Sequence, residues 1–115
     1  VNKKDESVPP RVSERQGADI LYRNLNSAFV KHDIQDDIFV QIIFDIHDIL
    51  QQEGIVDWNK NSEVKRIMAN RIDDYLYDVV KEANGVDLTS NEIKEIIDTT
   101  MKLAENNTEI FRHGS

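Results

Sequence analysis

The stretch that decides the fold is residues 57–89, DWNKNSEVKRIMANRIDDYLYDVVKEANGVDLT. Its apolar residues recur at steps of three and four, which is the period of an α-helix with one broad apolar face. Asn61 or Ser62 can cap the start, because a short polar side chain accepts hydrogen bonds from the free N–H groups of a first turn. Gly85 fits the left-handed position that closes a helix. The sequence therefore predicts one long helix over 61–84, with an inward face of Val64, Met68, Ile72, Tyr75, Leu76, Val79, Val80 and Ala83.

Two further helices are predicted before it, over 13–31 and 34–53. Ser13 and Gln16 have the spacing of a capping box for the first, and Asp19 is the alternative cap. Asp33 is the expected cap of the second. The second segment, DIFVQIIFDIHDILQQEG, is apolar around most of its circumference, which indicates a helix buried on several sides. It is therefore expected at the centre of the fold.

A fourth helix, over 90–106, has the clearest start signal in the chain. Thr89 and Glu92 form the S/T-x-x-E capping box, and Leu88 with Ile93 supplies the flanking apolar pair. Beyond this helix, two alternatives stay open for Ile110 and Phe111: they pack back on the core, or they belong to a frayed tail.

Together these elements predict an all-α bundle of about four helices without a sheet, because no segment alternates apolar and polar residues at the period of a strand. Residues 12–107 form the expected single domain. Residues 1–11, with Pro9-Pro10, are expected to link it to an upstream domain, and residues 108–115 to form a tail. The chain starts at Val1 without an initiator Met, and we expect it to be a domain of a larger protein.

The composition restricts the classes of function. No cysteine is present, which excludes disulfides and thiolate metal sites. No apolar run approaches the ~20 residues that a membrane helix needs. The net charge of −8 opposes general binding to nucleic acid, because phosphates attract Lys and Arg. Contact with DNA would need a local basic cluster, and the densest one is Lys60, Lys65 and Arg66.

The long helix also carries a resemblance to a known family. The residues concerned are Val56-Asp57-Trp58, Asn61, Val64, Met68 and the stretch 72–78, IDDYLYD. They resemble the C-terminal end of type I restriction endonuclease motor subunits (the R, or HsdR-type, subunit), and the likeness covers residues 55–104.

The resemblance implies a non-catalytic C-terminal helical domain in the cytoplasm of a bacterium. Its partners would be the methyltransferase and specificity subunits of a restriction complex, and duplex DNA in the full complex. The parent would be an ATP-dependent deoxyribonuclease and translocase that uses ATP and Mg²⁺ in its other domains. The departure to note is the −8 charge, which favours complex assembly over direct DNA binding.

No catalytic, cofactor-binding or metal site is predicted within the chain. His47 lies between Asp45 and Asp48, but these offsets do not put the three side chains on one helix face. The acids Asp74 and Asp78 do share a face, and either a solvated charged face or an acidic patch that meets a partner accounts for them better than a metal site. Two E-x-K triplets, 63–65 and 92–94, match a nuclease pattern by letter, but Glu is expected in the first turn of a helix from capping alone.

A partner interface is predicted on the outer face of the long helix. An outward tyrosine beside basic and amide groups suits such a surface, because Tyr and Arg are enriched at binding hot spots. The alternative to a restriction subunit is a free-standing helical adaptor, unrelated to restriction, that binds a protein partner through its helices. The candidate interface residues are Arg66, Asn70, Asp73, Asp74, Tyr77 and Lys81.

Overall fold

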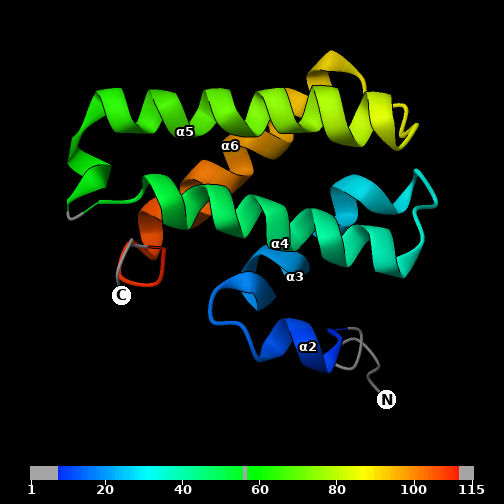
Figure 1. The fold of residues 1–115 in the computed structure, drawn as a ribbon, viewed down its shortest axis with the longest axis horizontal. Coiled ribbons are helices and arrows are strands. Elements are labelled where there is room, and N and C mark those ends of the chain that lie inside the picture. The colour runs from blue at the N-terminus through cyan, green and yellow to red at the C-terminus, as the bar shows by residue number, and fades with distance from the viewer. Residues whose placement is uncertain (1–7, 56, 112–115) are drawn as a thin grey trace.

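The computed structural model describes residues 8–55 and 57–111, and the regular elements within them are all helices, which confirms the predicted all-α bundle. Figure 1 shows α5 and η2 as one continuous rod along an edge of the molecule, with α6 crossing behind it and α4 alongside. Each of the four long helices packs on two others: α3 on α4 and α6, and α5 on the same pair. The elements are α2 (Pro10–Ser13), α3 (Ala18–Val30), α4 (Asp36–Glu53), the 3₁₀ turn η1 (Trp58–Lys60), α5 (Ser62–Tyr75), the π-helix η2 (Leu76–Ala83) and α6 (Ser90–Asn106).

The helix α4 lies at the centre of the bundle, as its wide apolar surface predicted. It packs on α3 on one side and on α5 on the other. Eight of its side chains are buried, more than in any other described helix, and they come from several sides of the helix. They are Phe39, Val40, Ile42, Ile43, Ile46, His47, Ile49 and Leu50.

The start of the first long helix differs from the prediction. Ser13 does not cap it: the Ser13 hydroxyl donates to Pro10 O within α2, and α3 begins only at Ala18. Proline at a first helical position favours this earlier, separate turn. Gly17, at φ +97°, then breaks the chain before α3, and neither Gln16 nor Asp19 provides a side-chain cap. The predicted linker falls mostly outside the described residues, but Pro10 and Arg11 belong to α2.

The cap assigned to Asp33 is also wrong. Asp33 adopts a left-handed conformation, with φ +53°, in the turn after α3. Asp tolerates this left-handed region better than most residues. An N-cap residue has an extended backbone instead, so Asp33 is not in the conformation of a cap. The next helix therefore begins at Asp36, with Gln35 in the capping position and no side-chain cap.

The long helix has the predicted ends but an unexpected last section. Asn61 accepts hydrogen bonds from the N–H groups of Glu63 and Val64, and Gly85 has a φ of +71°, as predicted. Residues 76–83, however, form a π-helix, closed by the bond from Asn84 N to Val79 O. A π-helix bonds each residue to the fifth along, so its turns are wider than those of an α-helix.

The wider turn changes which side chains face the core. The four buried residues of the rod are Met68, Ile72, Leu76 and Val80, each four positions after the last. In an α-helix, side chains four residues apart point in directions that differ by about 40°, so a row with this spacing would wind around the helix and away from the core. The π-helix turns less per residue and brings Val80 back toward the core. Val79 and Ala83, predicted inward, are exposed.

The C-terminal segment resolves the alternative left open for Phe111. The Phe111 side chain is fully buried, and its ring meets the ring of His47 edge-on at 5.6 Å between centroids. Gln51 Nε2 donates to Ile110 O at 3.0 Å. Residues up to Phe111 are therefore part of the fold rather than a tail, and residues 112–115 lie outside the described part of the chain.

The capping box of α6 is present as predicted. Thr89 Oγ1 accepts from Glu92 N at 3.1 Å, and Glu92 Oε1 accepts from Thr89 N at 2.9 Å. We expect Thr89→Ala to lower the free energy of unfolding by about 0.5–2 kcal/mol, because it removes this cap. Urea denaturation measures the change. The neighbouring Ser90→Ala, which removes an exposed hydroxyl outside the box, is the control; an equal loss in both variants would contradict the assignment.

Candidate interaction surface

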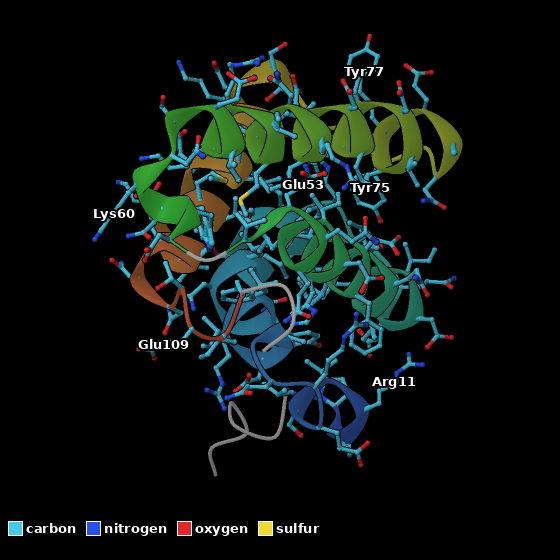
Figure 2. The ribbon with its side chains drawn as sticks, turned by 60° about the vertical axis from the view of Figure 1, so that its left-hand side comes forward. Arg11, Glu53, Lys60, Tyr75, Tyr77 and Glu109 are labelled. Atoms are coloured by element: carbon cyan, nitrogen blue, oxygen red, sulfur yellow. The ribbon has the colours of Figure 1, made fainter. Side chains whose placement is uncertain are left out.

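The outer face of the rod formed by α5 and η2 is exposed along most of its length. Arg66, Asn70, Asp73 and Tyr77 follow one another at steps of four, three and four residues, so they share one side of the helix. All four are exposed, and Tyr77 is 50% exposed, which is high for so large a side chain. Figure 2 shows Tyr77 pointing away from the body of the bundle. These four residues are called the Tyr77 face below.

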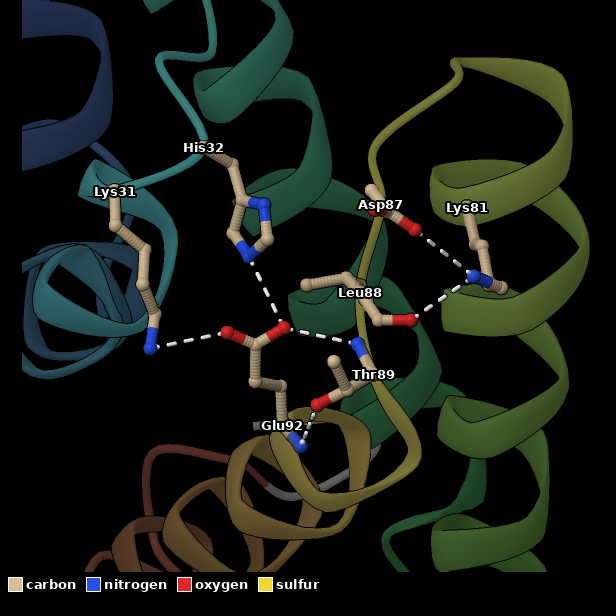
Figure 3. A network of polar contacts seen from close by, with 7 residues as sticks. All are labelled: Lys31, His32, Lys81, Asp87, Leu88, Thr89 and Glu92. Atoms are coloured by element: carbon tan, nitrogen blue, oxygen red, sulfur yellow. Dashed lines mark hydrogen bonds and ion pairs between the residues drawn. The ribbon is translucent and has the colours of Figure 1, made fainter.

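Lys81 does not belong to the Tyr77 face, although it was predicted there. Its ammonium group donates to Leu88 O at 3.0 Å and lies 3.5 Å from Asp87 Oδ1, as Figure 3 shows. The side chain is therefore directed at the segment that joins η2 to α6. Its role in the structure is to hold this connection, because it satisfies a carbonyl in the turn.

A first groove, of about 360 Å³, borders the Tyr77 face on the side of α6. Ile93 and Ile97 supply its apolar part, and Asp73 and Lys94 put one charge of each sign at its edge. Tyr77 itself forms part of the wall. A partner that covers Tyr77 would therefore also meet apolar surface of α6.

A second groove, of about 430 Å³, lies on the other flank of the rod, between it and α4. Four aspartates and one arginine line it, so we call it the acidic groove. Asp74, predicted beside Tyr77, lies here instead. The full lining is Asp45, Asp48, Ile49, Gln52, Arg71, Asp74, Tyr75, Asp78 and Val79.

Hydrogen bonds fix the inner wall of the acidic groove. Tyr75 OH donates to Asp45 Oδ2 at 2.6 Å, and Figure 2 shows Tyr75 pointing from the rod toward α4. Burial and this bond to a carboxylate raise the pKa of Tyr75, so the phenol stays protonated. Arg71 donates to Glu53 at 2.8 Å. Both bonds tie the rod to α4.

The predicted basic cluster lies at the start of the rod, and its charge is partly compensated. Lys60 is exposed in η1, and Figure 2 shows it at the opposite end of the rod from Tyr77. Lys65 is half-buried. Arg66 forms an ion pair with Glu63, one turn earlier. The cluster therefore offers fewer free charges than its sequence suggests.

The His47 side chain is buried in the fold. Its Nε2–H donates to Gln16 O at 2.8 Å. Burial lowers the pKa of His47, which keeps the imidazole neutral. Within residues 8–55 and 57–111, no three His, Cys, Asp or Glu side chains lie close enough together to hold a metal ion. Over the same residues, no helix is both long and apolar enough to cross a bilayer.

A polar network surrounds Glu92. The sequence predicted only the part of it that forms the capping box of α6. Glu92 Oε2 lies 3.0 Å from Lys31 Nζ, and Glu92 Oε1 lies 3.1 Å from His32 Nε2 (Figure 3). The bond from Thr89 N–H, and then that from Lys31, lowers the pKa of Glu92 to about 2. The network joins the end of α3 to the start of α6. Its members His32 and Glu92 are sixty positions apart in the sequence.

The lowered pKa of Glu92 makes stability depend on pH. The folded-state pKa lies below the ordinary value of 4.5, so the stabilisation is complete above about pH 4.5 and is lost as the pH falls through about 2. Glu92→Gln keeps an acceptor for Thr89 N–H but removes the charge. We expect the wild type to be the more stable at neutral pH and the two proteins to converge toward pH 2, measured by urea denaturation. A constant difference over this range would contradict the charge role.

Comparison of the chain with protein-family models, with curated proteins and with solved structures finds no match.

Proposed function

We propose that this chain is the non-catalytic C-terminal domain of a type I restriction enzyme motor subunit. In this role it docks the motor subunit on the methyltransferase core and contributes to DNA binding by the complex. Support comes from the resemblance over residues 55–104 together with one observation, the half-exposed Tyr77 on an outer face of the rod.

The stretch 72–78 contains both buried and exposed residues. Ile72 and Leu76 in it are fully buried, so the fold itself accounts for them. Asp73 and Tyr77 are exposed, and Tyr77 OH makes no hydrogen bond to any part of the chain that the structure describes. Neither residue belongs to the buried core, yet both belong to the stretch that carries the resemblance. An interface with another protein gives them a role, since buried tyrosines often dominate binding energy.

The DNA contribution is assigned to the other end of the rod. Lys60 and Lys65 lie there, and DNA held by the other domains of the parent would be brought near them by the tether. Hydrolysis of ATP and Mg²⁺-dependent cleavage belong, in this proposal, to those other domains. The domain adds contacts and position, and no chemical step.

Assembly of the parent motor subunit with the methyltransferase core tests the docking role. Tyr77→Ala is expected to weaken assembly by about tenfold, which is about 1.4 kcal/mol and modest for an interface tyrosine. Val30→Ala is the matched control, because Val30 is an exposed apolar residue on α3, away from the rod. Unchanged assembly with Tyr77→Ala would overturn the docking role, and binding of the chain to an unrelated protein through Tyr77 would support the adaptor alternative.

The charge of the chain leads to a prediction for DNA. We expect the isolated chain to bind duplex DNA weakly, with a slope of log affinity against log salt of about −3 or flatter, because at most three cations of the cluster meet phosphates. Anisotropy titrations at several salt concentrations measure the slope. Lys65→Glu with Arg66→Glu should flatten it further, whereas Lys102→Glu, an exposed lysine on α6, should change it less. A slope much steeper than −3 would show a larger DNA surface than this cluster.

A further inference from the structure

The acids of the acidic groove divide into two groups. On the α4 side, Asp45 accepts from Tyr75 and from Gln41, and Asp48 pairs with Arg15. On the rod side, Asp74 and Asp78 form no ion pair or hydrogen bond with other side chains of residues 8–55 and 57–111. The carboxylates of the first group are used by the fold, and those of the second remain available to a ligand.

Arg71 lines the same groove, but its ion pair is with Glu53 at the end of α4 and not with Asp74 or Asp78. Asp74 and Asp78 are one turn apart on the same helix, where two like charges repel slightly. A cation placed between them would relieve this repulsion and gain two charge-assisted hydrogen bonds.

The groove also has apolar surface beside these acids. Val79 is 38% exposed because the π-helix turns it away from the core, and Ile49 and the ring of Tyr75 continue the apolar wall toward α4. Apolar wall and acidic rim together match one kind of side chain: a long aliphatic stem with a cationic end, as in Arg and Lys. Arg fits better, because its planar fork can bond both carboxylates.

We propose that the acidic groove binds a basic amphipathic helix of a partner protein, with an arginine between Asp74 and Asp78 and its stem on Val79 and Tyr75. This inference rests on the proposed role of the chain as an interaction domain and specifies the chemistry of the partner. The net charge of −8 favours a basic protein over nucleic acid as the occupant, since it attracts the one and repels the other at long range. The groove runs between two helices, the setting in which a third helix docks with anchors one turn apart.

Neutral isosteres of the two acids provide the test. The probe is a fluorescent synthetic helical peptide with Arg and Leu one turn apart on the same face, titrated into the full chain. We expect Asp74→Asn with Asp78→Asn to weaken its binding by about tenfold. Glu95→Gln with Asp98→Asn is the matched control, because it removes two exposed charges from α6 outside the groove and should weaken binding less than about twofold. Neither pair disturbs the core, so both variants should fold.

The outcomes separate a site from a general effect of charge. Selective loss with Asp74→Asn and Asp78→Asn, and chemical-shift changes centred on residues 74–79, support the groove. Equal loss in both double variants shows attraction to overall charge alone and overturns the proposal, as does a peptide with Glu in place of Arg that binds as well. DNA that displaces the peptide from the groove also overturns it.

The same variants in the parent motor subunit distinguish this inference from the proposed function. If Tyr77→Ala weakens assembly while the groove variant assembles normally and still binds the peptide, the groove inference fails and the docking role stands. If the groove variant loses the peptide while Tyr77→Ala assembles normally, the docking role fails and the groove remains a site for a basic helix.

Discussion

Trp58→Ala is expected to destabilise the domain by about 3–5 kcal/mol, the range for removal of a large buried aromatic side chain. Trp58 is fully buried and is the largest of the buried side chains. It lies in η1, the short turn that leads into α5, so its ring holds the start of the rod against the bundle. Urea denaturation followed by circular dichroism measures the change, since the variant lacks the tryptophan signal.

Trp58→Phe is the informative control. The indole Nε1 is buried without a hydrogen-bond partner among the described residues. Phenylalanine removes this donor and keeps most of the apolar volume, so no hydrogen bond is lost and the cost comes from the smaller ring alone. The Phe variant should therefore keep most of the stability that the Ala variant loses. Equal destabilisation of the two variants would mean that the indole N–H makes an important contact.

The parts of the fold that the sequence predicted are those that local chemistry decides. α6 begins where it was predicted because Thr89 and Glu92 complete a capping box within four residues. Asn61 and Gly85 end the rod for similar reasons, since an N-cap and a left-handed closing residue act on their immediate neighbours. The burial of α4 was predicted because its composition leaves only a narrow polar stripe.

Contacts between distant residues account for the errors. Gly17 lies inside the helix predicted over 13–31, but a Cβ there would lie 2.7 Å from Ile110 and 2.9 Å from Phe111. The space that only a glycine fits at this break is thus set by a segment more than ninety positions away, which no local pattern contains. The same segment was assigned to a tail. A single apolar pair after Asn107 is too short to show a helical repeat, so the sequence did not indicate that it is buried.

The candidate surface shows the same division. The Tyr77 face follows from helical spacing, which places Arg66, Asn70 and Tyr77 together. The acidic groove forms only because α4 and the rod lie side by side. The sequence pattern of either helix alone does not determine their relative position. Glu92 was explained by its capping box, but its contacts with Lys31 and His32 depend on how α3 meets α6.

The π-helix leads to the most discriminating prediction. With α-helical spacing throughout, Leu76 and Val79 would both face inward, and truncation of either would leave a cavity. In the structure Leu76 is fully buried, whereas Val79 is 38% exposed on the wall of the acidic groove. We therefore expect Leu76→Ala to destabilise by about 2–5 kcal/mol, like Ile72→Ala one turn earlier.

Val79→Ala should cost less than about 1 kcal/mol, because a partly exposed valine loses little burial and alanine favours the helix. Urea denaturation of the two single variants, with Ile72→Ala as a reference inside the α-helical section, measures the contrast. Similar large losses for Leu76→Ala and Val79→Ala would show that the end of the rod is an ordinary α-helix. In that case Val79 would face the core and would no longer line the acidic groove, so this comparison of stabilities also tests the apolar wall on which the proposed arginine stem lies.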